Sequence, residues 1–335
     1  MAGAGGDIID LPRIDFSRKH QSLHMRLAVT TGSARHDYAV PVLVWGQGSG
    51  PGTLVMAGQH GNEYQGVLIL QRVLQRLGDR LSGNLVIIPT ANPSALVAAT
   101  RASPHDGLDL NRSFPGRLDG SHSEQIAHAI SPAILPHVDA ILDIHSGGYS
   151  TAIVPSVMMH DLPDKAQFGR MVEASRGFDV PWRVIIDETH KPGMFDSVAE
   201  DQGKLFYCPE LGGGSLSREV IDGGTRLVET FLATFGHLPG GRPAAAPSPL
   251  MLVPDQQHWS RATGDGVFSP MVALGDTVEQ GAVVGELISL EDPTAPAVTV
   301  SAPRTGLVYM VKVGGRVRAG DSLVVVAVKG DEAGL

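Results

Sequence analysis

The 335-residue sequence predicts an α/β fold, in which helices flank a mixed sheet, followed by a small all-β barrel or sandwich. Over residues 37–150, short apolar runs alternate with amphipathic stretches, which is typical of an α/β sheet. A Pro-, Gly- and Ala-rich segment at 237–249 then indicates a linker. Beyond it, residues 266–281 and 306–320 form a weak internal repeat of short strands and turns.

The expected organisation has four parts. We predict an N-terminal extension with short strands (1–36), a main α/β domain (37–240), a linker (241–250) and a β-barrel-like domain (251–335). Five apolar runs, rich in aliphatic and β-branched residues and ended by turn formers, predict buried strands. These runs are TLVMAG (53–58), NLVIIPT (84–90), DAILDIHS (139–146), RVIID (183–187) and LFYCPEL (205–211).

Three helices are predicted between and after these strands. The first carries an apolar stripe at residues 67, 70, 74 and 77 and ends at Gly78. The second begins with the capping-box pair Ser121 and Glu124, and Pro132 should kink or split the rest of this helix. The last runs from Ser217 to about Phe235.

Composition excludes several classes of partner. The net charge of -9 contains no strong basic block, so nucleic acid is not an expected partner. The single cysteine, Cys208, forms no internal disulfide and belongs to no zinc-finger motif, which favours a reducing compartment. No signal-like start and no run of about 18 apolar residues is present, so we expect a cytoplasmic protein without a membrane partner. Assembly into a homo-oligomer is compatible with the sequence.

Polar residues at the ends of two predicted strands suggest a metal site. His60 and Glu63 follow the first strand, where open α/β sheets bind their ligands, and His145 ends the third. Alone, His60 and Glu63 also fit a capped helix start. Two histidines and a carboxylate together form the three-ligand set of catalytic zinc, with a fourth position left for water.

Two further motifs add candidate residues. In DGLDLNRSFPG, Asn111 and Arg112 can grip a carboxylate, and Asp109 can hold the free ring nitrogen of a metal-binding histidine. A surface salt bridge and turn is the alternative for this string. Glu210, in CPELGGG, ends a strand and is a candidate general base.

The motifs GQHGNE, ATRASPHDGLDLNRSFPG, DIHSGG and PELGGG, in this order, resemble the succinylglutamate desuccinylase/aspartoacylase family of the zinc carboxypeptidase superfamily. The resemblance covers roughly residues 50–235, and a C-terminal β-domain is also a family feature. It implies a zinc carboxypeptidase-like fold and a cytoplasmic hydrolase that removes the acyl group from a small N-acyl amino acid.

The resemblance also implies roles for individual residues. One zinc per chain is held by His60, Glu63 and His145, and Glu210 activates the attacking water. Arg101 polarises the scissile carbonyl, and Asn111 and Arg112 bind the carboxylate of the substrate. Asp109 keeps the role inferred from its own motif, as the partner of a zinc-binding histidine.

For the substrate, RASPHDG, NRSFPGR, HSGG and ELGGG are similar to the family subgroup that deacetylates Nα-acetyl-2,4-diaminobutyrate in ectoine breakdown. Asp187 and Glu188 are the candidate partners of the distal ammonium of that substrate, although adjacent acids at a strand end are usually solvated. Alternatives are a succinylglutamate- or acetylaspartate-type deacylase and a metallocarboxypeptidase. A carrier or scaffold protein acting through the lipoyl-like C-terminal repeat is the non-enzyme alternative, which the lack of a Lys at the hairpin tip disfavours.

Overall fold

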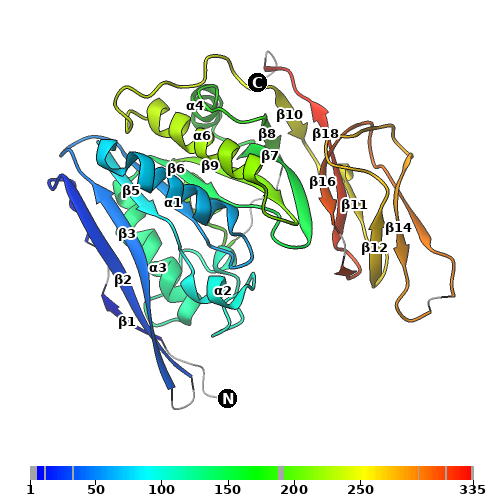
Figure 1. Ribbon diagram of the computed structural model, residues 1–335, viewed down its shortest axis with the longest axis horizontal. Coiled ribbons are helices and arrows are strands. Elements are labelled where there is room, and N and C mark those ends of the chain that lie inside the picture. Colours follow the sequence, from blue (N-terminus) through cyan, green and yellow to red (C-terminus); the bar gives the residue numbers. More distant parts are fainter. Residues whose placement is uncertain are drawn as a thin grey trace.

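The protein is described by a computed structural model, whose described residues are 6–10, 13–31, 34–187, 192–292, 294–313 and 315–332. Within them, a mixed sheet of 14 strands runs through the whole molecule (Figure 1). Its first nine strands are β1 (Gly6–Asp10), β2 (His20–Thr31), β3 (Ala34–Trp45), β4 (Gly52–Ala57), β5 (Asn84–Ile88), β6 (Ala140–Ile144), β7 (Thr151–His160), β8 (Trp182–Ile186) and β9 (Leu205–Gly213). Their spatial order is β1-β2-β3-β5-β4-β6-β9-β7-β8.

Helices cover both faces of this sheet. The α-helices are α1 (Gln65–Leu77), α2 (Pro93–Ala98), α3 (His122–Ile134), α4 (Lys165–Ser175), α5 (Phe195–Glu200) and α6 (Arg218–Thr234). Short 3₁₀ turns are η1 (Gly78–Arg80), η2 (Leu110–Arg112), η3 (Leu135–His137) and η4 (Gln256–His258). The side chains of α1, α4 and α6 share one apolar cluster, and those of α3 and α5 share another. The predicted α/β fold with flanking helices is therefore confirmed.

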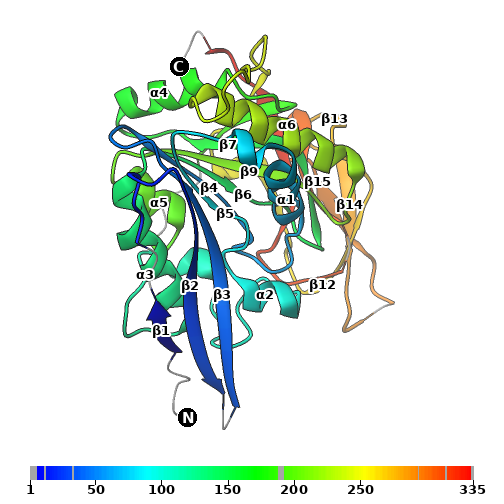
Figure 2. The same ribbon diagram turned by 60° about the vertical axis from the view of Figure 1, so that its left-hand side comes forward.

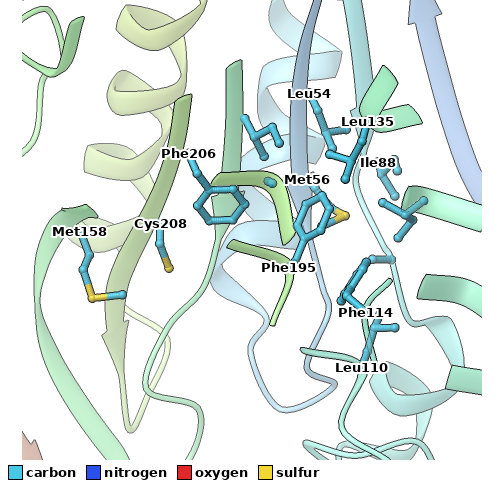
Figure 3. Packing of buried hydrophobic residues seen from close by; sticks show 14 of the residues in the cluster. Leu54, Met56, Ile88, Leu110, Phe114, Leu135, Met158, Phe195, Phe206 and Cys208 are labelled. Carbon is cyan, nitrogen blue, oxygen red and sulfur yellow. The ribbon is translucent and has the colours of Figure 1, made fainter. Parts of the chain in front are cut away.

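The alternation of side chains along β4 shows why its sequence is apolar throughout. Leu54 and Met56 belong to the cluster of α3 and α5, while Val55 and Ala57 belong to the cluster of α1 and α6. Figure 3 shows part of the cluster of α3 and α5, with Met56 near Phe195. A strand buried on both faces must be hydrophobic at consecutive positions, as parallel strands between helix layers are.

All five predicted strands are present, but the sequence analysis missed two features of the sheet. The hairpin β2–β3 has strands of 12 residues each, longer than the short strands expected before residue 37 (Figure 2). Strand β7 was also missed, and it contains Pro155. Because proline cannot donate to a ladder, the register of β7 with β9 is irregular between Ile153 and Ser156, where Pro155 lies.

Two helix predictions need correction. In α1 the buried face consists of Gly66, Ile69, Leu70, Val73 and Leu77 together with Gln65, so the predicted stripe was rotated. Positions 67 and 74 are only half-buried, because tertiary packing against α6 and the sheet selects the face. The helix α3 is not split at Pro132 and continues to Ile134. Pro132 lies in its last turn, so few backbone hydrogen bonds depend on it.

The C-terminal strands extend the same sheet and add a second one. They are β10 (Leu250–Val253), β11 (Trp259–Arg261), β12 (Gly266–Pro270), β13 (Thr277–Val278), β14 (Val283–Ile288), β15 (Val298–Ser301), β16 (Gly306–Lys312), β17 (Arg316–Val317) and β18 (Ser322–Lys329). β10 pairs with β8 in parallel, and β16 pairs with β7 antiparallel. The second sheet has the order β15-β14-β12-β17, and its side chains form a separate apolar cluster.

The predicted all-β C-terminal region is therefore confirmed, and Figure 1 shows it beside β7 and β8. Each half of the internal repeat forms a strand, a turn and a short strand, β12 with β13 and β16 with β17. Gly314, in the second half of the repeat, lies outside the described residues. The exact domain boundaries stay a prediction. β10 begins inside the predicted linker and is hydrogen-bonded to β8.

Candidate active site

The site lies where three neighbouring parallel strands end. β4 pairs with β6 and β6 pairs with β9, all in parallel, so their carboxyl ends meet at one edge. His60 follows β4, His145 directly follows β6, and Glu210 belongs to β9. His145 and Glu210 form a backbone bridge across the two strands. The topology thus brings together residues that lie up to 150 positions apart in sequence.

Two glycines shape the loop that carries His60 and Glu63. Gly58 has a φ of +74°, a left-handed conformation that an L side chain rarely adopts, and it turns the chain out of β4. A Cβ at Gly61 would overlap the backbone of Ala95. The loop therefore packs tightly against α2, and His60 and Glu63 are held before α1 begins at Gln65.

His60, Glu63 and His145 converge on one point. The Nδ1 atom of His60 lies 2.8 Å from Oε1 of Glu63 and 3.2 Å from Nδ1 of His145. Nδ1 of His145 lies 3.1 Å from Oε2 of Glu63. All three side chains are buried, and one ligand atom from each lies within 4.8 Å of the others.

The outer ring nitrogens of both histidines contact carboxylates. Nε2 of His60 lies 3.0 Å from Oδ1 of Asp109, and Nε2 of His145 lies 3.0 Å from Oδ2 of Asp143. Although burial opposes the charged form, Asp143 and Glu63 raise the pKa of His145 well above its ordinary value. The hydrogen bond to His60 lowers the pKa of Asp109, also against the effect of burial.

This arrangement suits a metal ion. Two inward ring nitrogens and a carboxylate would all act as ligands, and a cation between them would offset their mutual repulsion. The outward nitrogens, held by Asp109 and Asp143, are those that a metal-binding histidine usually offers to a carboxylate. The three residues therefore fit a mononuclear metal site with three protein ligands.

Glu210 lies beside His60, Glu63 and His145, and its carboxyl group has an unusually high pKa. Burial and the nearby Glu63 carboxylate raise the pKa of Glu210 to about 7, while His145, His60 and Arg101 act in the opposite direction. Its Oε2 atom is buried and has no hydrogen-bond partner among the described residues. A carboxyl group with a pKa near neutrality can both accept and release a proton at physiological pH.

Arg101, Asn111 and Arg112 line the same cavity. Arg101 approaches the set directly, with Nη1 3.5 Å from Oε1 of Glu63 and Nε 2.9 Å from Oδ2 of Asp109. Asn111 accepts a hydrogen bond at Oδ1 from the backbone N–H of Phe195, at 2.8 Å. Arg112 is exposed and donates from Nη1 to the backbone oxygen of Asn111. The expected metal ligands His60, Glu63 and His145, together with Glu210, Arg101, Asn111 and Arg112, thus line one cavity, and Asp109 contacts it through His60 and Arg101.

The cavity has a volume of about 350 Å³, the size for a small molecule. Asp187 does not line it. That residue is exposed and faces a different hollow, with His160 and Glu200, while Glu188 lies outside the described residues. Asp187 is therefore a solvated acid at a strand end, the interpretation that its position in the sequence favoured, because β8 carries its end away from the site.

Three residues near the site were missed by the sequence analysis. Asp143 lies two residues before His145, and residues at i and i+2 of a strand point to the same face, so the string DIH held a usable signal. Asp196, at the start of α5, and Lys312, on β16, also line the cavity. Both come from segments distant in sequence, and no local pattern marks them.

A His-Glu-His set that could hold a metal ion, beside a carboxyl group at the edge of an α/β sheet, is typical of metallohydrolases. The chain belongs to the succinylglutamate desuccinylase/aspartoacylase family, because the profile of the succinylglutamate desuccinylase/aspartoacylase catalytic domain matches residues 49–235. The expected family and the expected kind of enzyme, a hydrolase of N-acyl amino acids, are thereby confirmed.

Similar proteins extend this match over most of the chain. An N-alpha-acetyl-L-2,4-diaminobutyric acid deacetylase of Halomonas elongata is 35% identical over 291 residues, which cover 86% of this chain and 85% of the relative. A succinylglutamate desuccinylase/aspartoacylase structure from Rhodobacter sphaeroides has a TM-score of 0.88 at 31% identity, covering 96% and 99% of the two chains. The product-bound structure of the ectoine utilisation protein EutE (DoeB) from Ruegeria pomeroyi has a TM-score of 0.86 at 33% identity, covering 95% and 98%.

None of the helices in the described part of the chain is both long enough and apolar enough to cross a bilayer.

Proposed function

We propose that the protein is a zinc-dependent deacetylase that hydrolyses Nα-acetyl-L-2,4-diaminobutyrate to acetate and 2,4-diaminobutyrate. The observation that carries this proposal is the convergence of His60, Glu63 and His145 beside Glu210 in one small cavity. The named function of the Halomonas elongata relative and the ectoine-related solved structure support the choice of substrate.

In this proposal His60, Glu63 and His145 hold one zinc ion per chain. When bound, zinc supplies a Lewis acid that makes water a stronger nucleophile and polarises a carbonyl group. Asp109 and Asp143 orient the two histidines by accepting hydrogen bonds from their outer nitrogens. These hydrogen bonds to the outer nitrogens leave the other ring nitrogen of each histidine to face the metal.

Glu210 acts as the general base and then as the general acid. Its carboxylate accepts a proton from the attacking water, and the resulting carboxyl group donates that proton to the leaving amine. The pKa of about 7 suits both steps. Arg101 donates to the oxygen of the acetyl carbonyl as negative charge develops on it, an interaction whose removal costs on the order of 3 kcal/mol.

Asn111 and Arg112 bind the substrate carboxylate. With Oδ1 of Asn111 occupied by the N–H of Phe195, its NH₂ group is the end that donates to a ligand. The guanidinium of Arg112 lines the cavity and offers a charged donor. Together they place the scissile amide at a set distance from Glu210.

The test is a panel of substrates with amine release as the readout. The panel contains Nα-acetyl-L-2,4-diaminobutyrate, N-acetylaspartate, N-succinylglutamate and peptides of several lengths. We expect the first compound to have the highest kcat/KM. Preference for either acidic substrate would replace the proposed substrate, and efficient release of C-terminal residues from long peptides would replace the deacetylase with a carboxypeptidase.

Zinc dependence has its own test. Metal analysis of the purified protein should find about one zinc per chain, as three converging ligands require. Chelation should abolish turnover, and zinc should restore it. Full activity of the metal-free protein would contradict the metal site.

A further inference from the structure

We propose that Asp196 binds the distal ammonium group of the substrate and thereby selects a cationic side chain over a neutral one. This inference rests on the proposed deacetylase function. It concerns a residue nine positions after Asp187, an exposed acid that was only a candidate for the same role.

Asp196 is the one acid of the cavity, among the described residues, that has no assigned role. Of the residues that line it in the described part of the chain, three carry carboxyl groups: Glu63, Asp196 and Glu210. Glu63 belongs to the metal-ligand set, and Glu210 is the proposed base. Asp196 is the remaining carboxylate, and it is only 4% exposed. A buried carboxylate is costly unless a cation or several donors compensate it.

The Asp196 carboxylate is hydrogen-bonded by neutral groups of Ser197. Its Oδ1 atom accepts hydrogen bonds from the backbone N–H of Ser197 and from Oγ of Ser197, the latter at 3.0 Å. None of the ion pairs found among the described residues joins Asp196 to Arg101, Arg112 or Lys312, the cations of the cavity. Two neutral donors on one oxygen leave the carboxylate charge for a ligand to meet.

Asp196 follows Phe195, a residue that is held firmly in the core. Phe195 is fully buried, with its ring centroid 4.6 Å from that of Phe114 and 5.6 Å from that of Phe206 (Figure 3). Its backbone N–H donates to Asn111, and the N–H of Phe114 donates to the oxygen of Gly193. The segment 193–196 is therefore fixed against the segment 111–114, so Asp196 lies on a rigid support next to the proposed carboxylate-binding pair.

This placement matches the chemistry of the proposed substrate. In Nα-acetyl-2,4-diaminobutyrate the ammonium is two methylene groups from the carbon that bears the carboxylate. One small molecule can then meet Asn111 and Arg112 with its anionic group and Asp196 with its cationic group. An acidic side chain, as in acetylaspartate, would face Asp196 with like charge and be rejected.

The experiment compares two substrates of nearly the same shape. Nα-acetyl-L-norvaline replaces the ammonium by a methyl group. With wild-type protein, kcat/KM should favour the cationic substrate. Asp196→Asn, which keeps an oxygen for Ser197, should lower that preference by roughly 30-fold or more, the effect of removing one partner of a buried charge pair. Activity on Nα-acetyl-L-norvaline, which has no charge for Asp196 to meet, should fall much less than activity on the cationic substrate.

A structural role for Asp196 makes a different prediction. If Asp196 only caps the start of α5, Asp196→Asn will affect both substrates equally or neither, and the proposal is overturned. Asp187→Asn is the matched control, because it removes an exposed acid outside the cavity and should leave the preference unchanged. Thermal melting of each variant checks folding.

A binding measurement separates this inference from the proposed reaction. Calorimetry compares 2,4-diaminobutyrate with norvaline as ligands of the zinc-loaded wild type and of Asp196→Asn. Selective loss of diaminobutyrate binding supports the ammonium site even if neither acetylated substrate is cleaved, an outcome that refutes only the deacetylase reaction. Equal binding of diaminobutyrate by both proteins overturns the inference.

Discussion

Asp143 and His145 lie two residues apart at the end of β6, and Oδ2 of Asp143 is 3.0 Å from Nε2 of His145. Gln59 also donates to this carboxylate oxygen, so the Asp143 side chain is held from a second direction. The pair leaves Nδ1 of His145 facing His60 and Glu63.

Replacement of Asp143 by Asn should weaken metal binding. The histidine loses the partner that fixes its tautomer and increases its basicity, and such losses typically reduce metal affinity about 10- to 100-fold. Competition with a chelator of known affinity measures the change. Asp139→Asn is the control, because Asp139 precedes β6 and has an exposed side chain. This variant should leave the metal affinity unchanged. Unaltered affinity in Asp143→Asn would show that the pair does not support the metal.

Glu210→Gln should retain the metal and lose most turnover, because an amide cannot accept the proton of the attacking water. Metal analysis and amine release measure the two effects separately. Unchanged turnover would assign the base to another group.

The pH profile tests the same residue. The reaction needs the ionised carboxylate of Glu210, whose pKa is about 7, so kcat/KM should fall as pH decreases through that value. Well below that pH, kcat/KM should decrease by close to tenfold for each pH unit. A rate that stays constant from pH 8 to pH 5 would contradict this assignment.

His122 should make stability depend on pH. Burial first, and then the nearby His105, lower the pKa of His122 to about 4. The unfolded chain therefore binds a proton between about pH 6.5 and pH 4 that the folded chain does not. The contribution of neutral His122 to the free energy of unfolding is fully present above about pH 6.5. It is lost as pH falls, so the free energy of unfolding is lower by about 2 kcal/mol at pH 5.

Urea unfolding at pH 7 and pH 5 measures this loss. His122→Gln removes the titrating group and should show a smaller difference between the two pH values than wild type. His24→Gln, at an exposed position on β2, serves as the control. An equal difference in His122→Gln and wild type would show that other groups cause the acid sensitivity.

Lys312 links the C-terminal region to the cavity. It is on β16, which pairs with β7, and its Nζ donates to Oγ of Ser150 at 3.1 Å. Lys312→Met should raise KM several-fold for a substrate with a carboxylate and leave kcat nearly unchanged, because a positive charge at the cavity attracts the anion. Steady-state kinetics at low and moderate salt measure this effect. A KM that does not change at low salt would exclude this contribution.

Much of the site could be predicted from the sequence because its residues end apolar runs. His60 and His145 each follow a strand that is recognisable by composition, Glu210 lies within the last residues of another, and the ends of parallel strands meet at one edge. The order of the four motifs then indicated the family. The buried strands were predictable for the same reason, since burial on both faces demands a continuous apolar run.

The remaining features depended on pairings between distant segments. The buried face of α1 was selected by α6 and the sheet, and β16 reached β7 across about 150 residues of chain. Asp196, rather than Asp187, lines the cavity because Phe195 packs between Phe114 and Phe206. The sequence by itself determined which side chains end the strands. Only the tertiary structure decided which charges surround them, because side-chain neighbours across a cavity arise from packing and register that no local pattern encodes.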